Sequence, residues 1–167
     1  LRAFIAIEMP SDVVEHLRGL ITKIRPQEHG NLRTVHPEGI HLTLKFLGDI
    51  EQCQTASITQ AMASACVKKK PFKLRMSKTG FFPNKITPRV LWVGVDGQTE
   101  NLTNLQQSVE MSLASLGIPR ENRSFNPHLT LARIRKNISS EQWQAVKLSL
   151  ATNPVNEKLE IQVKSIS

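Results

Sequence analysis

His41-Leu42-Thr43-Leu44 recurs unchanged as His128-Leu129-Thr130-Leu131, and this repeat carries most of the information about the fold. The 167-residue chain has five histidines, so the repeat involves one of the ten pairs that they can form. At background composition, about 0.002 coincidences of this kind are expected among those pairs. Chance is therefore a poor explanation, and we expect the two copies to share a role.

The spacing within each copy is typical of a half-buried strand. Successive side chains of a strand point to opposite faces, so the histidine and the threonine share one face and the two leucines share the other. If fully buried, each leucine contributes about 1.5 to 3 kcal/mol to the free energy of folding. The pattern predicts two strands that are anchored by leucines and present an imidazole and a hydroxyl on the outer face.

Hydrophobic periodicity outside the repeat predicts further strands and helices. Asp12 is the expected N-cap of the first helix, which Pro26 ends, and Ser139 with Gln142 resembles a capping box that opens the last helix. Besides the two HLTL segments, the predicted strands span residues 3–7, 72–76, 89–95 and 157–165, and the predicted helices span residues 12–25, 51–66, 102–116 and 139–150.

Each half of the chain places an HLTL strand shortly before a helix. The simplest architecture is an α+β fold in a single bilobal domain over residues 1–167. We expect two related lobes of mainly antiparallel sheet with flanking helices. A twofold-like packing of these lobes directs both HLTL faces into a central cleft, to which each half contributes one motif.

The charge composition favours a polyanionic partner. The 22 basic and 14 acidic residues give a net charge of +8, which attracts nucleic acid by counterion release, although a solvated basic surface without a partner is an alternative. No apolar run reaches the length of a membrane span or a signal-peptide core. About 20 Å of predicted helix separates Cys53 from Cys66, which is beyond disulfide reach. We expect a soluble, reduced, cytoplasmic protein.

Two imidazoles and two hydroxyls in one cleft suit the chemistry of an RNA phosphodiester. A neutral imidazole can take a proton from an attacking water while a protonated one delivers a proton to the departing ribose oxygen, and each transfer typically contributes about 10² to 10⁴-fold. Threonine hydroxyls can donate to the non-bridging oxygens as phosphorus becomes five-coordinate. This reaction requires no metal ion, and no ligands have the short spacing of zinc motifs. A single His beside a Thr is usually only a satisfied polar group, but the doubling argues against that interpretation.

Several segments resemble the 2H phosphoesterase superfamily, in particular its RNA 2′,3′-cyclic phosphodiesterase branch, historically named 2′-5′ RNA ligase. Besides the two motifs, the likeness is carried by RAFIAIEMP (2–10), LKFLGDI (44–50), PRVLWVGV (88–95) and FNPHLTLAR (125–133). The resemblance implies a bilobal fold with a cleft between the lobes and hydrolysis of RNA 2′,3′-cyclic phosphate ends to 2′-phosphomonoesters. It implies no cofactor, and as partner it implies RNA with a cyclic phosphate terminus, such as an end derived from tRNA.

The resemblance also implies roles that two identical motifs cannot distinguish by themselves. His41 matches the proton donor and His128 the proton acceptor. Thr43 and Thr130 match phosphate-binding hydroxyls, and Arg133 matches a basic residue after the second motif. Strict alternation places Arg133, five residues after His128, on the opposite face of the strand. A β-bulge or the end of the strand must therefore intervene.

Other interpretations of the same site remain open. The substrate can be a 2′-5′ linkage that is made or broken, or a small cyclic nucleotide. A non-catalytic RNA-binding module would hold a terminal phosphate without turnover between about pH 5 and 8. Relatives usually continue beyond Ser167, so we expect that a short terminal segment is lacking, and Leu1 suggests a missing initiator Met. We expect a monomer.

Side chains near the motifs are further candidates. Lys45 shares the face of His41 if the strand is regular, and the alternative is a solvated charge at the strand end. Phe46 and Phe125 are candidates for base stacking, whereas Trp92, within an apolar run, is expected to pack in the core. Three histidines have no recurrent partner and are expected to lie on the surface: His16, His29 and His36.

Overall fold

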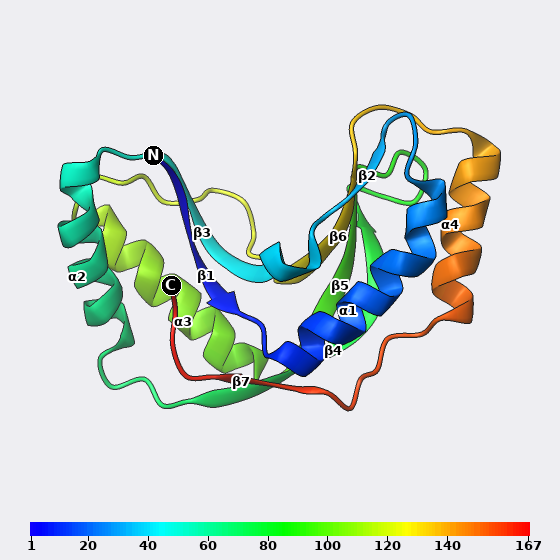
Figure 1. The fold of residues 1–167 in the computed structure, drawn as a ribbon. Coiled ribbons are helices and arrows are strands. Elements are labelled where there is room, and N and C mark those ends of the chain that lie inside the picture. The colour runs from blue at the N-terminus through cyan, green and yellow to red at the C-terminus, as the bar shows by residue number, and fades with distance from the viewer.

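The computed structural model describes residues 1–167 and shows a V-shaped molecule with a curled antiparallel sheet in each arm (Figure 1). The smaller sheet pairs β1 (Arg2–Glu8) with β3 (His41–Asp49). The larger sheet has the strand order β2-β6-β5-β4-β7. Its strands are β2 (Leu32–Thr34), β4 (Phe72–Phe82), β5 (Val90–Gly97), β6 (His128–Ile134) and β7 (Glu160–Val163). The predicted α+β class is confirmed.

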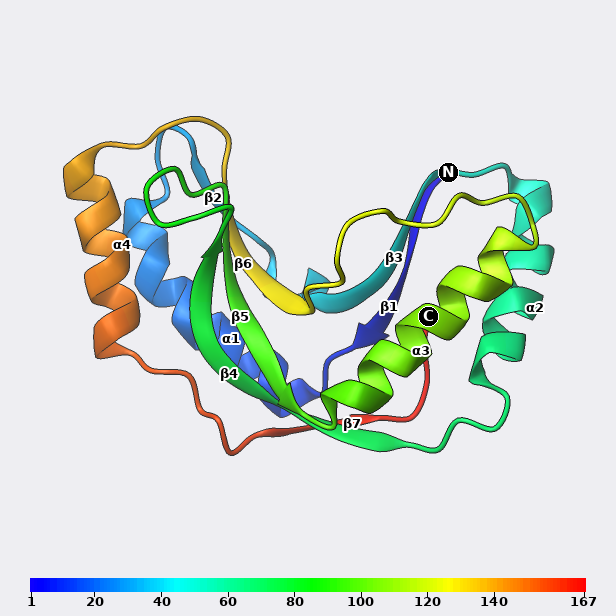
Figure 2. The ribbon, with the colours of Figure 1, turned by 180° about the vertical axis from the view of Figure 1, so that it is seen from behind.

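Two pairs of helices flank the sheets (Figure 2). α2 and α3 pack together and α3 contacts β3, whereas α1 packs against α4 and contacts β6. The four helices are α1 (Ser11–Ile24), α2 (Thr55–Cys66), α3 (Thr99–Ala114) and α4 (Ser140–Thr152). Short 3-10 helices occupy Arg25–Gln27, Pro37–Gly39 and Gln52–Gln54. No helix combines the length and the apolar character that a membrane span requires.

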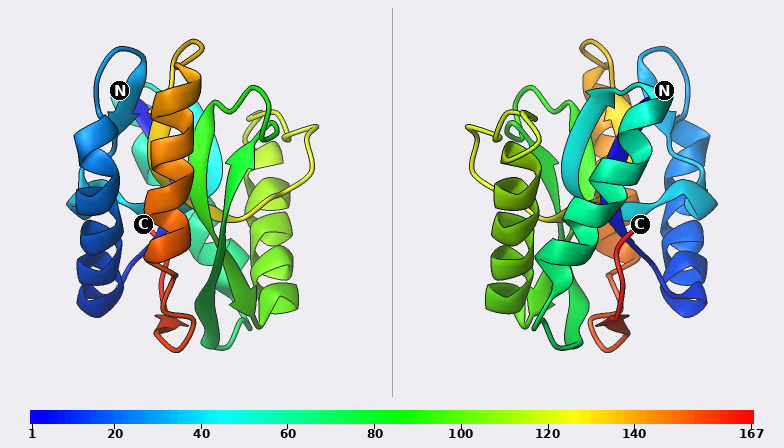
Figure 3. Two further views of the ribbon diagram at one scale, coloured as in Figure 1. Left: turned by 90° about the vertical axis from the view of Figure 1, so that its right-hand side faces the viewer. Right: turned by 90° about the vertical axis from the view of Figure 1, so that its left-hand side faces the viewer.

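The two arms do not correspond to the two halves of the sequence. β2 and α1 come from the first half of the sequence, yet they pack with β6 and α4 in the arm that contains the larger sheet. α3 comes from the second half, yet it contacts β3 in the arm that contains the smaller sheet. Each half of the sequence therefore contributes elements to both arms. A side view shows α1 beside α4 on one side of the molecule and α2 beside α3 on the other (Figure 3). The strands that carry the motifs, β3 and β6, are thereby held in opposing sheets.

The buried side chains form one hydrophobic cluster that includes all four leucines of the repeat. The predicted strand at residues 72–76 belongs to β4, in which Phe72, Leu74 and Met76 are buried while Lys73 and Arg75 are exposed. The last strand is shorter than predicted. Beyond it, the end of the chain joins β1 through two backbone hydrogen bonds of 2.9 Å, between the N–H and C=O groups of Ser167 and those of Ala6.

The helix boundaries correct two details of the prediction. α1 begins at Ser11 with Pro10 at the cap position, so Asp12 lies in the first turn and is not the N-cap. At α4, Ser139 is the N-cap and its hydroxyl accepts from the Gln142 backbone N–H at 3.1 Å. The Gln142 side chain does not close a capping box, because it is buried and donates to the carbonyl oxygens of Gln27 and His29.

The structure also corrects the predicted surface position of one histidine. His16 is half-buried, and its Nε2 accepts a hydrogen bond of 3.0 Å from the Asn156 backbone N–H. Partial burial lowers the pKa of His16. The side chain thus fixes the segment before β7 against α1. His29 and His36 are exposed, as predicted, and Cys53 and Cys66 are both free thiols.

Gly80 allows β4 and β5 to pair beside a large side chain. It lies opposite Trp92, and a Cβ atom at position 80 would overlap the six-membered ring of the indole. Because the Phe82 ring also packs against the indole, with the ring centroids 4.9 Å apart, the indole has little room to move. We expect Gly80→Ala to reduce the free energy of unfolding by about 1 to 3 kcal/mol through overpacking. Urea denaturation measures this loss.

A matched control is available for this substitution. Gly19 lies within α1 and has open space where a Cβ atom would be. Gly19→Ala is therefore expected to leave the stability unchanged or to raise it by up to about 1 kcal/mol, since alanine has the higher helix propensity. Equal stabilities of the two variants would contradict the described packing of Trp92.

Candidate active site

Both HLTL motifs face one cavity of about 510 Å³ between β3 and β6. His41, Thr43, His128 and Thr130 are half-buried and line it, while the leucines between them point into the core. Arg133 lines the same cavity. The structure thus brings together all five residues that the sequence singled out.

A β-bulge occurs at the same place in both motifs. In β3, Lys45 and Thr43 pair with consecutive residues of β1, so Leu44 is an extra residue. In β6, Ala132 and Thr130 pair with consecutive residues of β5, so Leu131 is the extra residue. A bulge reverses the faces of the residues that follow it. The bulge in β6 therefore returns Arg133 to the cavity.

The bulge in β3 makes both interpretations of Lys45 wrong. Lys45 is neither on the His41 face nor solvated, because the bulge turns it into the protein, where it is only 6% exposed. Its Nζ donates to Glu110 Oε2 at 2.9 Å and to the Pro119 carbonyl at 2.7 Å. The same carboxylate accepts from the Glu121 backbone N–H at 3.1 Å. This ion pair ties β3 to α3 and to the segment that leads to β6.

Hydrogen bonding fixes the orientation of His128. Its Nδ1 lies 2.6 Å from the Asn126 carbonyl oxygen, which can only accept, so Nδ1 carries the hydrogen. The Phe82 ring meets the imidazole edge-on, with the centroids 5.0 Å apart. Nε2 is the ring nitrogen that remains for chemistry in the cavity.

His41 has different surroundings. Its imidazole stacks on the Phe4 ring with a centroid separation of 4.2 Å and an interplanar angle of 10°. No protein group hydrogen-bonds to the ring in the way that Asn126 bonds to His128. The two histidines therefore begin identical tetrapeptides but have different neighbours in the folded chain.

Sequence reasoning missed several residues of the site. Phe4 and Arg2 line the cavity from β1, where Glu8 pairs with His41 and alternation places residues 2 and 4 on the same face as residue 8. Asn126 acts through its backbone carbonyl, which no side-chain pattern reveals.

Phe46, a candidate from the sequence, lines the cavity and is 65% exposed. It is the fifth residue after His41, as Arg133 is the fifth residue after His128. Trp92 corrects the expectation of core packing, because it is only partly buried and lies outside the hydrophobic cluster. It pairs with Thr130, and its ring packs against Phe82 and lies near His128.

A second cavity of about 390 Å³, here called the loop cavity, adjoins the first, which we call the histidine cavity. The two share Thr43, Phe46 and His128. The far wall of the loop cavity comes from α3 and from the segment before β6, including Phe125. The motif residues therefore lie where two cavities meet.

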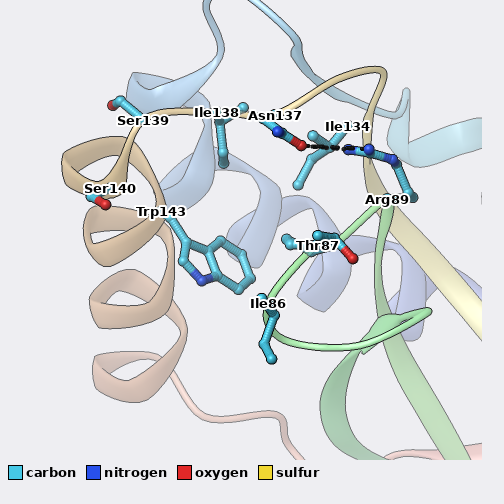
Figure 4. A pocket seen from close by; sticks show the side chains of 10 residues that line it. Ile86, Thr87, Arg89, Ile134, Asn137, Ile138, Ser139, Ser140 and Trp143 are labelled. Carbon is cyan, nitrogen blue, oxygen red and sulfur yellow. Dashed lines mark hydrogen bonds between the residues drawn. The ribbon is translucent and has the colours of Figure 1, made fainter.

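A third cavity, of about 210 Å³, lies between the β4–β5 connection and the start of α4 (Figure 4). Arg89 donates to Asn137 Oδ1 there, and Trp143 forms a wall. It contains no histidine or carboxylate for proton transfer. No group of three His, Cys, Asp or Glu side chains in the molecule is arranged to hold a metal ion. The histidine cavity is therefore the candidate active site.

The sequence of the chain is similar to those of known proteins. A family described as "LigT like Phosphoesterase" matches residues 7–92 and 93–167. Proteins named RNA 2′,3′-cyclic phosphodiesterase are similar to the chain. The one from Archaeoglobus fulgidus is 32% identical over 136 residues, which are 81% of this chain and 74% of the relative. The one from Aquifex aeolicus is 38% identical over 60% of this chain and 54% of its own length, so that match spans only about half of the relative.

Solved structures share the fold. TT0787 of Thermus thermophilus superposes with a TM-score of 0.77 at 28% identity, over 100% of this chain and 86% of that one. E. coli LigT in its apo form superposes with a TM-score of 0.71 at 21% identity, over 99% of this chain and 84% of that one. The V-shaped pair of sheets is therefore an arrangement that known proteins adopt.

Proposed function

The chain belongs to the family of LigT-like phosphoesterases, and we propose that it hydrolyses 2′,3′-cyclic phosphate ends of RNA to 2′-phosphomonoesters by two-histidine acid and base catalysis. The names of the similar proteins support this activity. The observation that carries the proposal is the single cavity to which both motif histidines belong. Because both halves of the chain supply its walls, we infer that residues 1–167 act as one catalytic unit.

His128 is the proposed proton acceptor and His41 the proposed donor. With Nδ1–H donated to Asn126, neutral His128 carries its lone pair on Nε2 and can take a proton from water as the water oxygen bonds to phosphorus. Protonated His41 gives its proton to O3′ as the bond between phosphorus and O3′ breaks. The phosphate stays on O2′, and the two rings recover their protonation states by exchange with solvent.

Three other side chains are proposed to hold the phosphate. The hydroxyls of Thr43 and Thr130 donate to the non-bridging oxygens, whose negative charge must be stabilised as phosphorus becomes five-coordinate. Arg133 adds a positive charge on the same face. Proton transfer by two imidazoles uses no metal ion, so we propose a metal-independent reaction.

The decisive experiment uses an RNA oligonucleotide that ends in a 2′,3′-cyclic phosphate. We expect turnover to a product that retains phosphate on the 2′ oxygen, at the same rate in excess EDTA. Phosphate on the 3′ oxygen would contradict the proposed direction of ring opening. Tight binding without turnover would indicate an RNA-end-binding module, and joined RNA products would indicate a ligase.

Removal of either threonine hydroxyl is expected to slow the reaction. Thr43→Val and Thr130→Val keep the side-chain shape and should each lower kcat by about 10²-fold, since each removes one donor to the transition state. Thr79→Val is a matched control, because Thr79 is also a half-buried strand residue but lines neither cavity. Steady-state kinetics measure the effect, and an equal kcat in all three variants would exclude the threonines from phosphate binding.

A further inference from the structure

Unpaired cations extend from the histidine cavity to the tip of the arm that contains the larger sheet. Arg133 lines the cavity near the end of β6, Arg135 and Lys136 follow β6, and Lys85 lies between β4 and β5. The last two segments lie at the tip of this arm (Figure 1, Figure 2). These cations are exposed and form no ion pair. Since residues 71–95 and 122–140 contain no Asp or Glu, the tip is positively charged.

The opposite exit, through the loop cavity, has no such excess of positive charge. Lys45 pairs there with Glu110 at 2.9 Å, and Arg123 pairs with Glu121 at 3.1 Å. The hydrogen bond from Arg123 lowers the pKa of Glu121 to about 2, so both members of that pair are ionised. A polyanion gains free energy by releasing counterions from unpaired charges. The tip is therefore the favoured direction for the phosphates of a bound RNA.

The positive tip leads to the third cavity, of about 210 Å³ beside Trp143, here called the outer cavity (Figure 4). It lies on the far face of the larger sheet from the histidine cavity. Trp143 packs against the edge of Phe81, with the ring centroids 4.6 Å apart, whereas the next residue, Phe82, packs against His128. Only the tip of the arm therefore separates the two cavities.

The walls of the outer cavity combine apolar surface with a cation. The Trp143 indole forms one wall, and Ile86, which is 89% exposed, lies beside it (Figure 4). The Arg89 guanidinium donates only to Asn137 Oδ1, at 3.4 and 3.5 Å, so most of its N–H groups are free to bind a ligand. Aromatic side chains stack on any nucleobase, and arginine binds phosphate. These features suit one nucleotide of a single-stranded RNA.

The distance between the two cavities sets the length of RNA that can reach both. Ile134, which lines the outer cavity, lies six residues after His128 in β6. At about 3.3 Å per residue, this segment spans about 20 Å. A stacked strand advances about 3.4 Å per nucleotide, so about six nucleotides cover the same distance. A cyclic mononucleotide bound at His128 cannot reach the outer cavity.

Resting on the proposed function, we propose that the outer cavity is a second binding site for single-stranded RNA, occupied by a nucleotide upstream of the cyclic phosphate end. The strand leaves the histidine cavity past Arg133 and crosses the tip beside Lys85 and Lys136. One base then lies against Trp143, and a phosphate lies at Arg89. This site distinguishes RNA of several nucleotides from small cyclic nucleotides, although the same histidines act on both.

A cyclic mononucleotide and a ten-nucleotide single-stranded RNA that ends in the same cyclic nucleotide separate the two sites. Wild-type protein should have a KM for the RNA at least about fivefold below that for the mononucleotide, since stacking on Trp143 is gained. Trp143→Leu should remove this difference. Ile86→Asp puts a negative charge at an exposed position of the same cavity and should raise the KM of the RNA alone, by about three- to tenfold. The kcat of both substrates should stay unchanged.

Salt dependence tests the positive tip separately. In Lys85→Ala/Lys136→Ala, the slope of log KM for the RNA against log salt should fall by about 1.4, at about 0.7 for each lost phosphate contact. Lys70→Ala/Lys158→Ala is the matched control, because both lysines are exposed, form no ion pair and line neither cavity. The control should keep the wild-type slope.

Thermal unfolding shows whether Trp143→Leu, which loses a contact with Phe81, remains folded. Ile86→Asp and Lys85→Ala/Lys136→Ala change exposed side chains only, so their results do not depend on that outcome. An unchanged KM of the RNA in Ile86→Asp, together with equal salt slopes in the two lysine variants, would overturn the second site. Turnover of the mononucleotide would then still support the proposed function, whereas no turnover of either substrate would remove that function itself.

Discussion

His128→Ala and His41→Ala are each expected to lower kcat for cyclic phosphate hydrolysis by about 10² to 10⁴-fold, because each removes one of the two proton transfers. Both rings line the histidine cavity and neither is fully buried, so the folded structure should persist. The double variant should be little slower than the slower single variant, since the two groups act in one step. Single-turnover kinetics with a cyclic phosphate oligonucleotide measure these rates.

His29→Ala is the control for the histidine substitutions. His29 is exposed and its side chain lies outside the histidine cavity, so its loss should leave kcat unchanged. Thermal unfolding of all variants separates lost chemistry from lost structure. Retention of most activity in both His41→Ala and His128→Ala would remove these residues from the mechanism.

The largest expected loss of stability follows Glu110→Leu. The side chains of Lys45 and Glu110 are each only 6% exposed. The substitution therefore leaves the Lys45 ammonium buried, with only the Pro119 carbonyl as a partner. Removing one member of a buried pair typically costs about 3 to 5 kcal/mol. The double variant Lys45→Met/Glu110→Leu should recover most of that loss, since no charge then remains buried. Urea denaturation of the single and double variants gives the coupling energy.

The exposed ion pair between Arg75 and Asp96 serves as the control for the buried pair. Their N···O distance is also 2.9 Å, but both side chains are more than half exposed. Arg75→Met should cost less than about 1 kcal/mol, since exposed pairs contribute little. A Glu110→Leu variant as stable as Arg75→Met would show that Lys45 escapes to solvent, which contradicts the described burial.

The sequence was sufficient for the parts of the fold that depend on local periodicity. Alternation in the two HLTL segments correctly placed their leucines in the core and their polar residues on one face. The position of Arg133 could be derived only by requiring an irregularity in the strand, and the β-bulge at Leu131 supplies it. The same irregularity at Leu44 was not required by any residue, so neither interpretation of Lys45 placed its side chain inside the protein.

Features that depend on long-range packing could not be predicted. The exchange of α1 and α3 between the arms follows from how the sheets pair, and no local pattern encodes it. The partner of His128 is a backbone carbonyl, and the partner of His41 is Phe4, 37 positions away along the chain. These contacts distinguish the two histidines, although the motifs that contain them are the same.

The pH dependence of kcat/KM in the wild type and in the two alanine variants tests the central claim most directly. If one neutral and one protonated imidazole act on one phosphorus, the wild-type rate must fall on both sides of an optimum near neutrality. The residual activity of His128→Ala should no longer fall on the acidic side, and that of His41→Ala should no longer fall on the alkaline side. Both variants keeping the two-sided wild-type profile would contradict catalysis by this pair.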